Sequence, residues 1–371
     1  MSTSSSPSCP RRLPDELIIM VIERCNYLSY KRDQTLAALC HLNKRFKPAA
    51  ERVLYSKVNL EGEPAANTVL YALVHFRRFR SFVKKVQLCI EHSTLDAINT
   101  DVVHVLCGLP HVEELDAYSI DAAPGLLLAH PDCRLRYFSL EEWDSKAARL
   151  MASRHGALAA LEHLEIGFID DFSGAPPVLP SLKQLSVQEG HECPAFKQFV
   201  APLVGQITSL SLMDRSTSFG AVDLSTWAKL EHLTLDLRHL LDQAELESAI
   251  SIIVAAIQSA PRWPGLASFA LGASAYQRTS FELPASTNDI LLALPPQLRV
   301  LTLLTNAIRA VDLATFLLSS LRPPALRTLR LGRALGRDFR AILNDAEGRH
   351  GALAGELERA GIEVTTTAVV L

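Results

Sequence analysis

One short apolar pattern returns through most of the chain and limits the folds open to it. The pattern is apolar-x-x-apolar-x-apolar, and ten copies begin between residues 83 and 326, on average 27 residues apart. The copies are VKKVQL (83), VEELDA (112), LRYFSL (135), LEHLEI (161), LKQLSV (182), ITSLSL (207), LEHLTL (230), LASFAL (266), LRVLTL (298) and LRTLRL (326). A period in the range of roughly 20 to 50 residues indicates an array of units that stack and share one core.

The spacing within each copy predicts a short strand with one buried face. Residues two apart, such as Leu233 and Leu235, lie on the same face of a strand, and Leu230 enters the same interior from the preceding turn. The final segment, GIEVTTTAVVL, is predicted to supply an atypical capping strand. Five intervening segments are predicted to be helical, and these are 145–154, 194–205, 241–260, 311–321 and 337–347.

The pattern and its period resemble the leucine-rich repeat. That family usually carries Asn or Cys three positions after the last apolar strand residue, and here only Asn306 fits. The resemblance implies an α/β solenoid over residues 83–371, an irregular horseshoe of about ten parallel strands with convex helices and a C-terminal cap.

The strand residues between the buried positions are expected to face the concave side, which is the usual binding face of such a solenoid. Early strands carry acids there and the last strands carry bases, a polarity that would orient a charged protein client. For any single residue, the alternative is a merely solvated sheet face. The candidate client-binding residues are Glu114, Asp116, Glu162, Glu165, His232, Asp236, Arg299, Arg327 and Arg330.

The segment RRLPDELIIMVIERC, residues 11–25, predicts a separate N-terminal helix. Pro14 suits the first position of a helix, where its missing N–H would be unpaired anyway. Asp15 and Glu16 meet the positive end of the helix dipole. Six apolar residues follow, far fewer than a membrane-spanning helix needs.

This helix is apolar on more than one side. Leu17 and Val21 lie on one stripe, whereas Ile19 and Met20 lie on another. A second predicted helix, near 34–55, can cover only one of them. Because a module of this size cannot bury all its apolar surface, the remainder predicts a protein partner.

Residues 12–58, with LPDELIIMVIERC followed by LAALCHLNKRFKPAAERVLYSKV, resemble the F-box in the version common in fungal proteins. The resemblance implies a three-helix module that docks on a Skp-type adaptor, which in turn joins a cullin–RING ubiquitin ligase. The family often has Trp where this chain has Phe46. The alternative is a small helical cap that closes the solenoid. The residues that the resemblance assigns to the adaptor contact are Leu13, Pro14, Leu17, Ile18, Ile19, Met20, Ile22, Leu39 and Phe46.

Two further segments complete the expected organisation. The Ser-rich residues 1–11 are predicted to be a disordered leader. Residues 59–82 are predicted to be a linker with a helical cap. Within HFRRFRSFVKKVQ, residues 75–87, the phenylalanines fall three apart, which predicts a helix packed on the first repeat with its cations in water. The alternative for this segment is binding of nucleic acid.

Composition and motifs argue against several classes of function. A net charge of −3 gives no general attraction to nucleic acid or anionic lipid. The seven cysteines are scattered and never form a C-x-x-C pair, so we expect reduced thiols in a cytoplasmic or nuclear protein. His191 and Cys193 lack a second pair of ligands at metal-binding spacing. No catalytic motif occurs, and we expect no enzymatic activity, metal, cofactor or membrane contact.

Together these patterns predict the substrate-recognition subunit of a Skp–cullin–F-box ubiquitin ligase. In this hypothesis the helical module binds the adaptor and the repeats bind an unknown protein client. Two alternatives stay open, namely a leucine-rich-repeat scaffold without a ligase role and a repeat protein that regulates a GTPase.

Overall fold

A computed structural model of the chain divides into two compact units, which we describe separately. The first comprises Met1–Asp116 with Asp121–Arg134, and the second comprises Ala117–Ile120 with Leu135–Leu371. The structure describes residues 15–25, 32–42, 44–59, 71–88, 105–106, 108–117, 127–128, 130–169, 178–189, 194–213, 226–236, 250–251, 253–255, 257, 265–273, 287–305, 308–345 and 351–367. The predicted leader, 1–11, lies outside them.

The first unit begins with three helices, α1 (Asp15–Cys25), α2 (Arg32–Leu42) and α3 (Lys47–Leu54). Side chains from all three meet in a small core of Ile22, Leu36 and Ala50, which are fully buried. The predicted helix near 34–55 is divided into α2 and α3, which agrees with the three-helix module that the resemblance implies. The chain forms two helices here, because Pro48 cannot continue a helix but fits in the first turn of a new one.

Parallel strands follow directly on α3. β1 (Lys57–Asn59) pairs in parallel with β2 (Lys85–Leu88), so that Val58 lies opposite Val86. β3 (Glu114–Ala117) follows, and the backbone N–H of Glu114 donates to the carbonyl of Lys84. The sequence pattern did not predict β1, which is three residues long. The sheet therefore starts within the predicted helical module, because Val58 is a buried strand residue.

The basic, Phe-rich segment between β1 and β2 differs from its prediction. It forms the short 3₁₀ helix η1 (Arg77–Phe82) after the helical residues 71–75. Phe79 is buried and stacks on Tyr55 just after α3, with ring centroids 4.1 Å apart. Arg80 is also buried, and its Nε donates to the carbonyl of Leu73. The expectation that all cations of this segment lie in water is wrong for Arg80, because the tight turn of a 3₁₀ helix carries it inward beside Phe79.

In the second unit, nine parallel strands follow one another in chain order. Eight of them are predicted strands and the ninth, β12, is the predicted C-terminal cap. Adjacent strands are in register, so that Leu233 lies opposite Leu210 and Phe269 with all three side chains buried. The strands are β4 (Tyr137–Trp143), β5 (His163–Ile169), β6 (Gln184–Glu189), β7 (Ser209–Met213), β8 (His232–Asp236), β9 (Ser268–Ala273), β10 (Val300–Thr305), β11 (Thr328–Gly332) and β12 (Glu363–Thr367).

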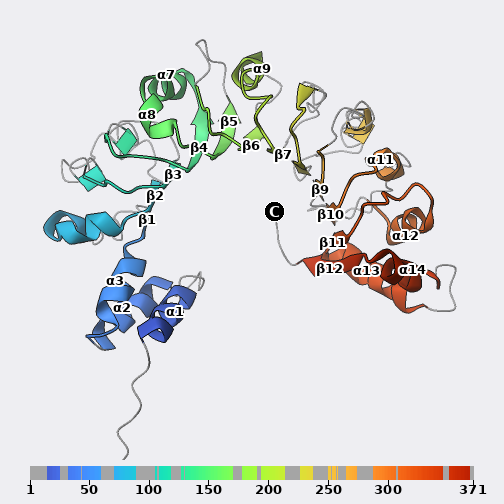
Figure 1. Cartoon of the computed structure of the whole chain (residues 1–371), viewed down its shortest axis with the longest axis horizontal. Coiled ribbons are helices and arrows are strands. Elements are labelled where there is room, and N and C mark those ends of the chain that lie inside the picture. Colours follow the sequence, from blue (N-terminus) through green and yellow to red (C-terminus); the bar gives the residue numbers. More distant parts are fainter. Residues whose placement is uncertain are drawn as a thin grey trace, which may run out of the picture. The chain divides into compact units, whose positions relative to one another are not determined.

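The helices of the second unit lie on one side of this sheet and leave the other side open (Figure 1). Four of the five predicted helical segments coincide with helices. The fifth, 241–260, lies largely outside the described residues, although its described positions are helical. α8, α11 and α14 were not predicted. The helices are α7 (Ser145–Ser153), α8 (His155–Leu158), α9 (Pro194–Val200), α11 (Thr287–Ala293), α12 (Ala310–Leu318), α13 (Arg333–Asn344) and α14 (Leu353–Ala360).

One short parallel strand per repeat, in chain order and not closed into a barrel, defines a leucine-rich-repeat solenoid. The predicted fold class is confirmed. Asn306, the one position that fits the family's asparagine, lies outside the described residues. In the part of the chain that the structure describes, no helix has the length and hydropathy required to cross a bilayer.

Candidate functional site

The first helix carries a stripe of exposed aliphatic side chains. Leu17, Met20 and Val21 are 41%, 50% and 55% exposed, and their spacing of three and four residues places them on one side of α1. We call these three residues the α1 stripe. Ile19 is also exposed, but it lies on the other side of the helix, so the predicted grouping of Met20 with Ile19 on one stripe is wrong. Large aliphatic groups held together in water on one helix turn form a surface suited to another protein.

The α1 stripe stays exposed because the core beneath it is small. Ile22 is fully buried in that core, so its prediction as an adaptor contact is wrong. Leu39 and Phe46 pack against the same core and are only partly exposed, so they support the module more than they extend its surface. Leu13, Pro14 and the side chain of Ile18 lie outside the described residues.

The predicted set also omitted two exposed residues. Val21 lies one turn after Leu17, and that spacing alone places it on the same stripe. Leu42, at the last position of α2, is 72% exposed. Residue type alone could not identify Val21 or Leu42 as exposed, because Ile22 is equally apolar and yet fully buried.

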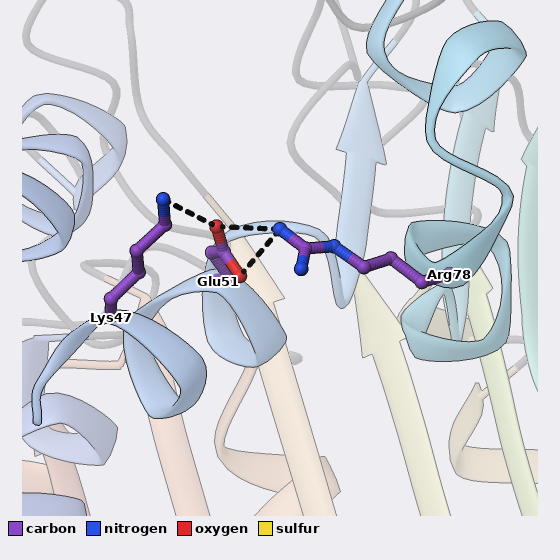
Figure 2. Close-up of polar contacts among 3 residues, drawn as sticks. All are labelled: Lys47, Glu51 and Arg78. Carbon is purple, nitrogen blue, oxygen red and sulfur yellow. Dashed lines mark hydrogen bonds and ion pairs between the residues drawn. The ribbon is translucent and has the colours of Figure 1, made fainter. Parts of the chain in front are cut away.

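A second cluster joins the helical module to the solenoid, and we call it the α3–η1 joint. Arg78 of η1 donates to both carboxylate oxygens of Glu51 on α3, at 3.2 and 3.3 Å, while Lys47 lies 3.8 Å from the same group (Figure 2). The Arg78 guanidinium also lies 4.7 Å from the centre of the Phe79 ring. Burial raises the pKa of the stacked Tyr55 phenol, and the Glu51 charge adds to that rise.

Replacing Arg78 by Ala is expected to lower the free energy of unfolding by about 1 kcal/mol. The change removes two hydrogen bonds from one guanidinium nitrogen to a mostly buried carboxylate, and it also removes the contact with the Phe79 ring. Lys47→Ala is the matched control. Its ion pair with the same carboxylate is longer, 3.8 Å against 3.2 Å, and is spaced i, i+4, so we expect a loss of only about 0.3 kcal/mol. Urea unfolding of both variants measures the difference. Equal effects would show that the Arg78 contact adds nothing specific.

Four of the predicted client-binding acids already have partners within the chain. Each accepts a hydrogen bond from a side chain on the preceding strand or just before it, and in two of the four pairs the donor is a cation that offsets the charge of the acid. The pairs are Lys85–Glu114 (2.9 Å), Gln87–Asp116 (2.8 Å), Arg136–Glu162 (3.0 Å) and Tyr137–Glu165 (2.6 Å).

The remaining predicted client residues divide into buried and exposed ones. Asp236 is only 1% exposed, so its prediction as a client contact is wrong; it lies at the end of β8, enclosed between Met213 and Gly272 of the neighbouring strands. His232 is exposed at the start of the same strand. Arg327 is exposed, but its guanidinium donates to backbone carbonyls, including that of Ala360.

Arg299 and Arg330 are exposed, and neither makes an ion pair or side-chain hydrogen bond with the described part of the chain. The basic end of the predicted polarity is therefore still available to a partner.

Groups that could hold a metal or act as nucleophiles are scarce in the described residues. No three His, Cys, Asp or Glu side chains among them gather as a metal site would require. Cys40 and Cys133 are free thiols. Burial raises the pKa of Cys133 to about 11, which keeps this thiol protonated and unreactive at neutral pH.

Comparison with known proteins adds little to this picture. No family model matches the chain, and no curated protein matches it either. Among solved structures, an internalin from Listeria monocytogenes is similar over 92% of this chain and 96% of that chain, with 12% sequence identity and a TM-score of 0.34. At that TM-score, the fold assignment rests on the sheet itself.

Proposed function

We propose that the chain is a non-catalytic substrate receptor of a Skp–cullin–F-box ubiquitin ligase. In this role the α1 stripe docks on a Skp-type adaptor, and the open sheet face of the solenoid binds a protein client. The observation that carries the proposal is the exposure of Leu17, Met20 and Val21 together on one helix. Such a receptor would work in the cytoplasm or the nucleus.

An exposed stripe of this kind fits a groove on a protein. Anchors at i, i+3 and i+4 are the arrangement by which an amphipathic helix enters an apolar groove. Glu16 and Arg24, both exposed, flank the stripe and would form a polar rim. The choice of a Skp-type adaptor comes from the resemblance of residues 12–58 to the F-box.

The way the module is attached supports the same proposal. Only Tyr55 and Ser56 separate α3 from β1, and the carbonyl of Ser56 accepts hydrogen bonds from the backbone N–H groups of Lys84 and Lys85. With the α3–η1 joint, these contacts make the helices continuous with the first strands. A partner bound at α1 would be held at a fixed distance from those strands.

Co-purification with a Skp-type adaptor tests the proposal. We expect stoichiometric recovery of the adaptor with the wild-type chain. The double variant Met20→Lys with Val21→Lys should lose most of it, because two cations would enter an apolar groove. Val311→Lys is the matched control, since Val311 on α12 is 50% exposed, close to the 55% of Val21.

Each other outcome points to a named alternative. Recovery that the double variant leaves unchanged would place the adaptor contact outside the α1 stripe and contradict the proposal. No recovery with the wild-type chain would favour a scaffold without a ligase role. Stimulation of a GTPase by the chain would favour the regulator instead.

A further inference from the structure

Three exposed arginines lie within eight residues of one another near the C-terminal end of the solenoid. Arg330 lies in the middle of β11, and Arg333 and Arg337 follow in the first two turns of α13. All three are exposed, and none has an ion pair or side-chain hydrogen bond with a residue that the structure describes. We call them the arginine track.

The neighbouring strands offer the track no carboxylate at its register. Arg330 lies between Thr302 on β10 and Thr365 on β12. Leu331 is buried, so the next outward position on β11 is Gly332, which has no side chain, and α13 begins at once with Arg333. The track therefore consists of one arginine on the open sheet face and two on the helix that begins directly after β11.

The early repeats show the opposite arrangement. Three pairs of charged residues that lie side by side on neighbouring strands, or directly before them, have opposite signs and form ion pairs there. These pairs are Lys84–Glu113 (2.7 Å), Lys85–Glu114 (2.9 Å) and Arg136–Glu162 (3.0 Å). Early in the array, an acid thus lies beside each of these cations, whereas the acid nearest to the track on β12 is Glu363, which lies opposite Thr328 and makes no ion pair with Arg330.

The sequence of α13 keeps like charges together. Arg333, Arg337 and Arg340 follow at i, i+4 and i+7, a spacing at which cations on one helix side repel each other. Asp338 is neither three nor four residues from any of them and cannot relieve that repulsion along the helix. The first turn holds Arg333 and no acid, although the helix dipole disfavours a cation there.

We infer that the arginine track binds an acidic segment of a protein partner. Arginine guanidinium groups bind carboxylates with two parallel hydrogen bonds, and repulsion along α13 would fall on binding. A narrow carboxylate-bearing segment fits better than a broad polyanion, because Asp338 is exposed on the same helix and the whole chain has a net charge of −3. This inference holds whether or not the helical module binds an adaptor.

Fluorescence anisotropy with the full chain and a labelled peptide of alternating Glu and Gly tests the inference. Reversing all three charges, with Arg330→Glu, Arg333→Glu and Arg337→Glu, should weaken binding about tenfold or more. The control reverses three exposed lysines elsewhere in the solenoid, Lys183→Glu, Lys197→Glu and Lys229→Glu, and so changes the net charge equally. We expect it to shift the affinity less than about twofold, and binding by the wild type to weaken with added salt.

Several results would overturn the inference. These are no measurable binding of the peptide, an equal loss in the control variant, or tighter binding of a single-stranded DNA oligonucleotide or of phosphatidylserine vesicles at the same track. A neutral variant with Gln at the three positions guards against a folding artefact. It should melt at or above the wild-type temperature, because it removes only repulsion, and should still bind the peptide more weakly.

Discussion

Replacing Leu233 by Ala is expected to lower the free energy of unfolding by about 2–5 kcal/mol. Leu233 is 1% exposed in the centre of β8 and lies in register between Leu210 and Phe269. The shorter side chain would leave a cavity shared by three repeats, and the strands on either side cannot close it without breaking their own register. Urea unfolding followed by circular dichroism measures the change.

Leu321→Ala is the control for this prediction. Leu321 is exposed in the turn after α12, so its removal should change stability by less than about 0.5 kcal/mol. A loss below about 1 kcal/mol for Leu233→Ala would contradict the continuous core on which the solenoid depends.

Gly167→Ala is expected to destabilise the chain by about 1–3 kcal/mol. Gly167 lies in β5 beside Glu141 of β4. A Cβ there would lie 2.6 Å from the Glu141 carbonyl oxygen and 3.0 Å from its Cα. Both atoms belong to the backbone of a paired strand, so relief requires the two strands to move apart.

Gly156→Ala is the matched control, because Gly156 lies in α8 and a Cβ there would meet nothing within 4 Å. Alanine favours helix, so we expect a gain of about 0.5–1 kcal/mol. Thermal unfolding of the two variants should shift in opposite directions. A shift in the same direction for both would show that the β4–β5 contact does not restrict residue 167.

The strands could be predicted from the sequence because each carries the same constraint. A residue such as Leu235 must point inward on every repeat, and that requirement leaves a pattern that returns along the chain. β1 was not predicted because it is only three residues long and Val58 is its one buried apolar residue. The short helices α8, α11 and α14 were not predicted because their side of the sheet imposes no fixed length or spacing on the returning segment.

The candidate site could be predicted only in part. The excess of apolar residues in α1 followed from composition, but which ones lie outside depends on how α2 and α3 pack, and sequence spacing did not show that Ile22 fills the core. The prediction of Asp236 as a client contact was wrong for a related reason. Strand alternation placed it on the open face, yet the neighbouring strands enclose the end of β8.

Hydrogen–deuterium exchange of the full chain, with and without a Skp-type adaptor, tests the central claim most directly. We predict that backbone amides of α1, Asp15–Cys25, exchange more slowly when the adaptor is present, whereas those of α12 do not change. Bound adaptor with unchanged exchange in α1, or with protection only in the solenoid, would contradict docking through Leu17, Met20 and Val21.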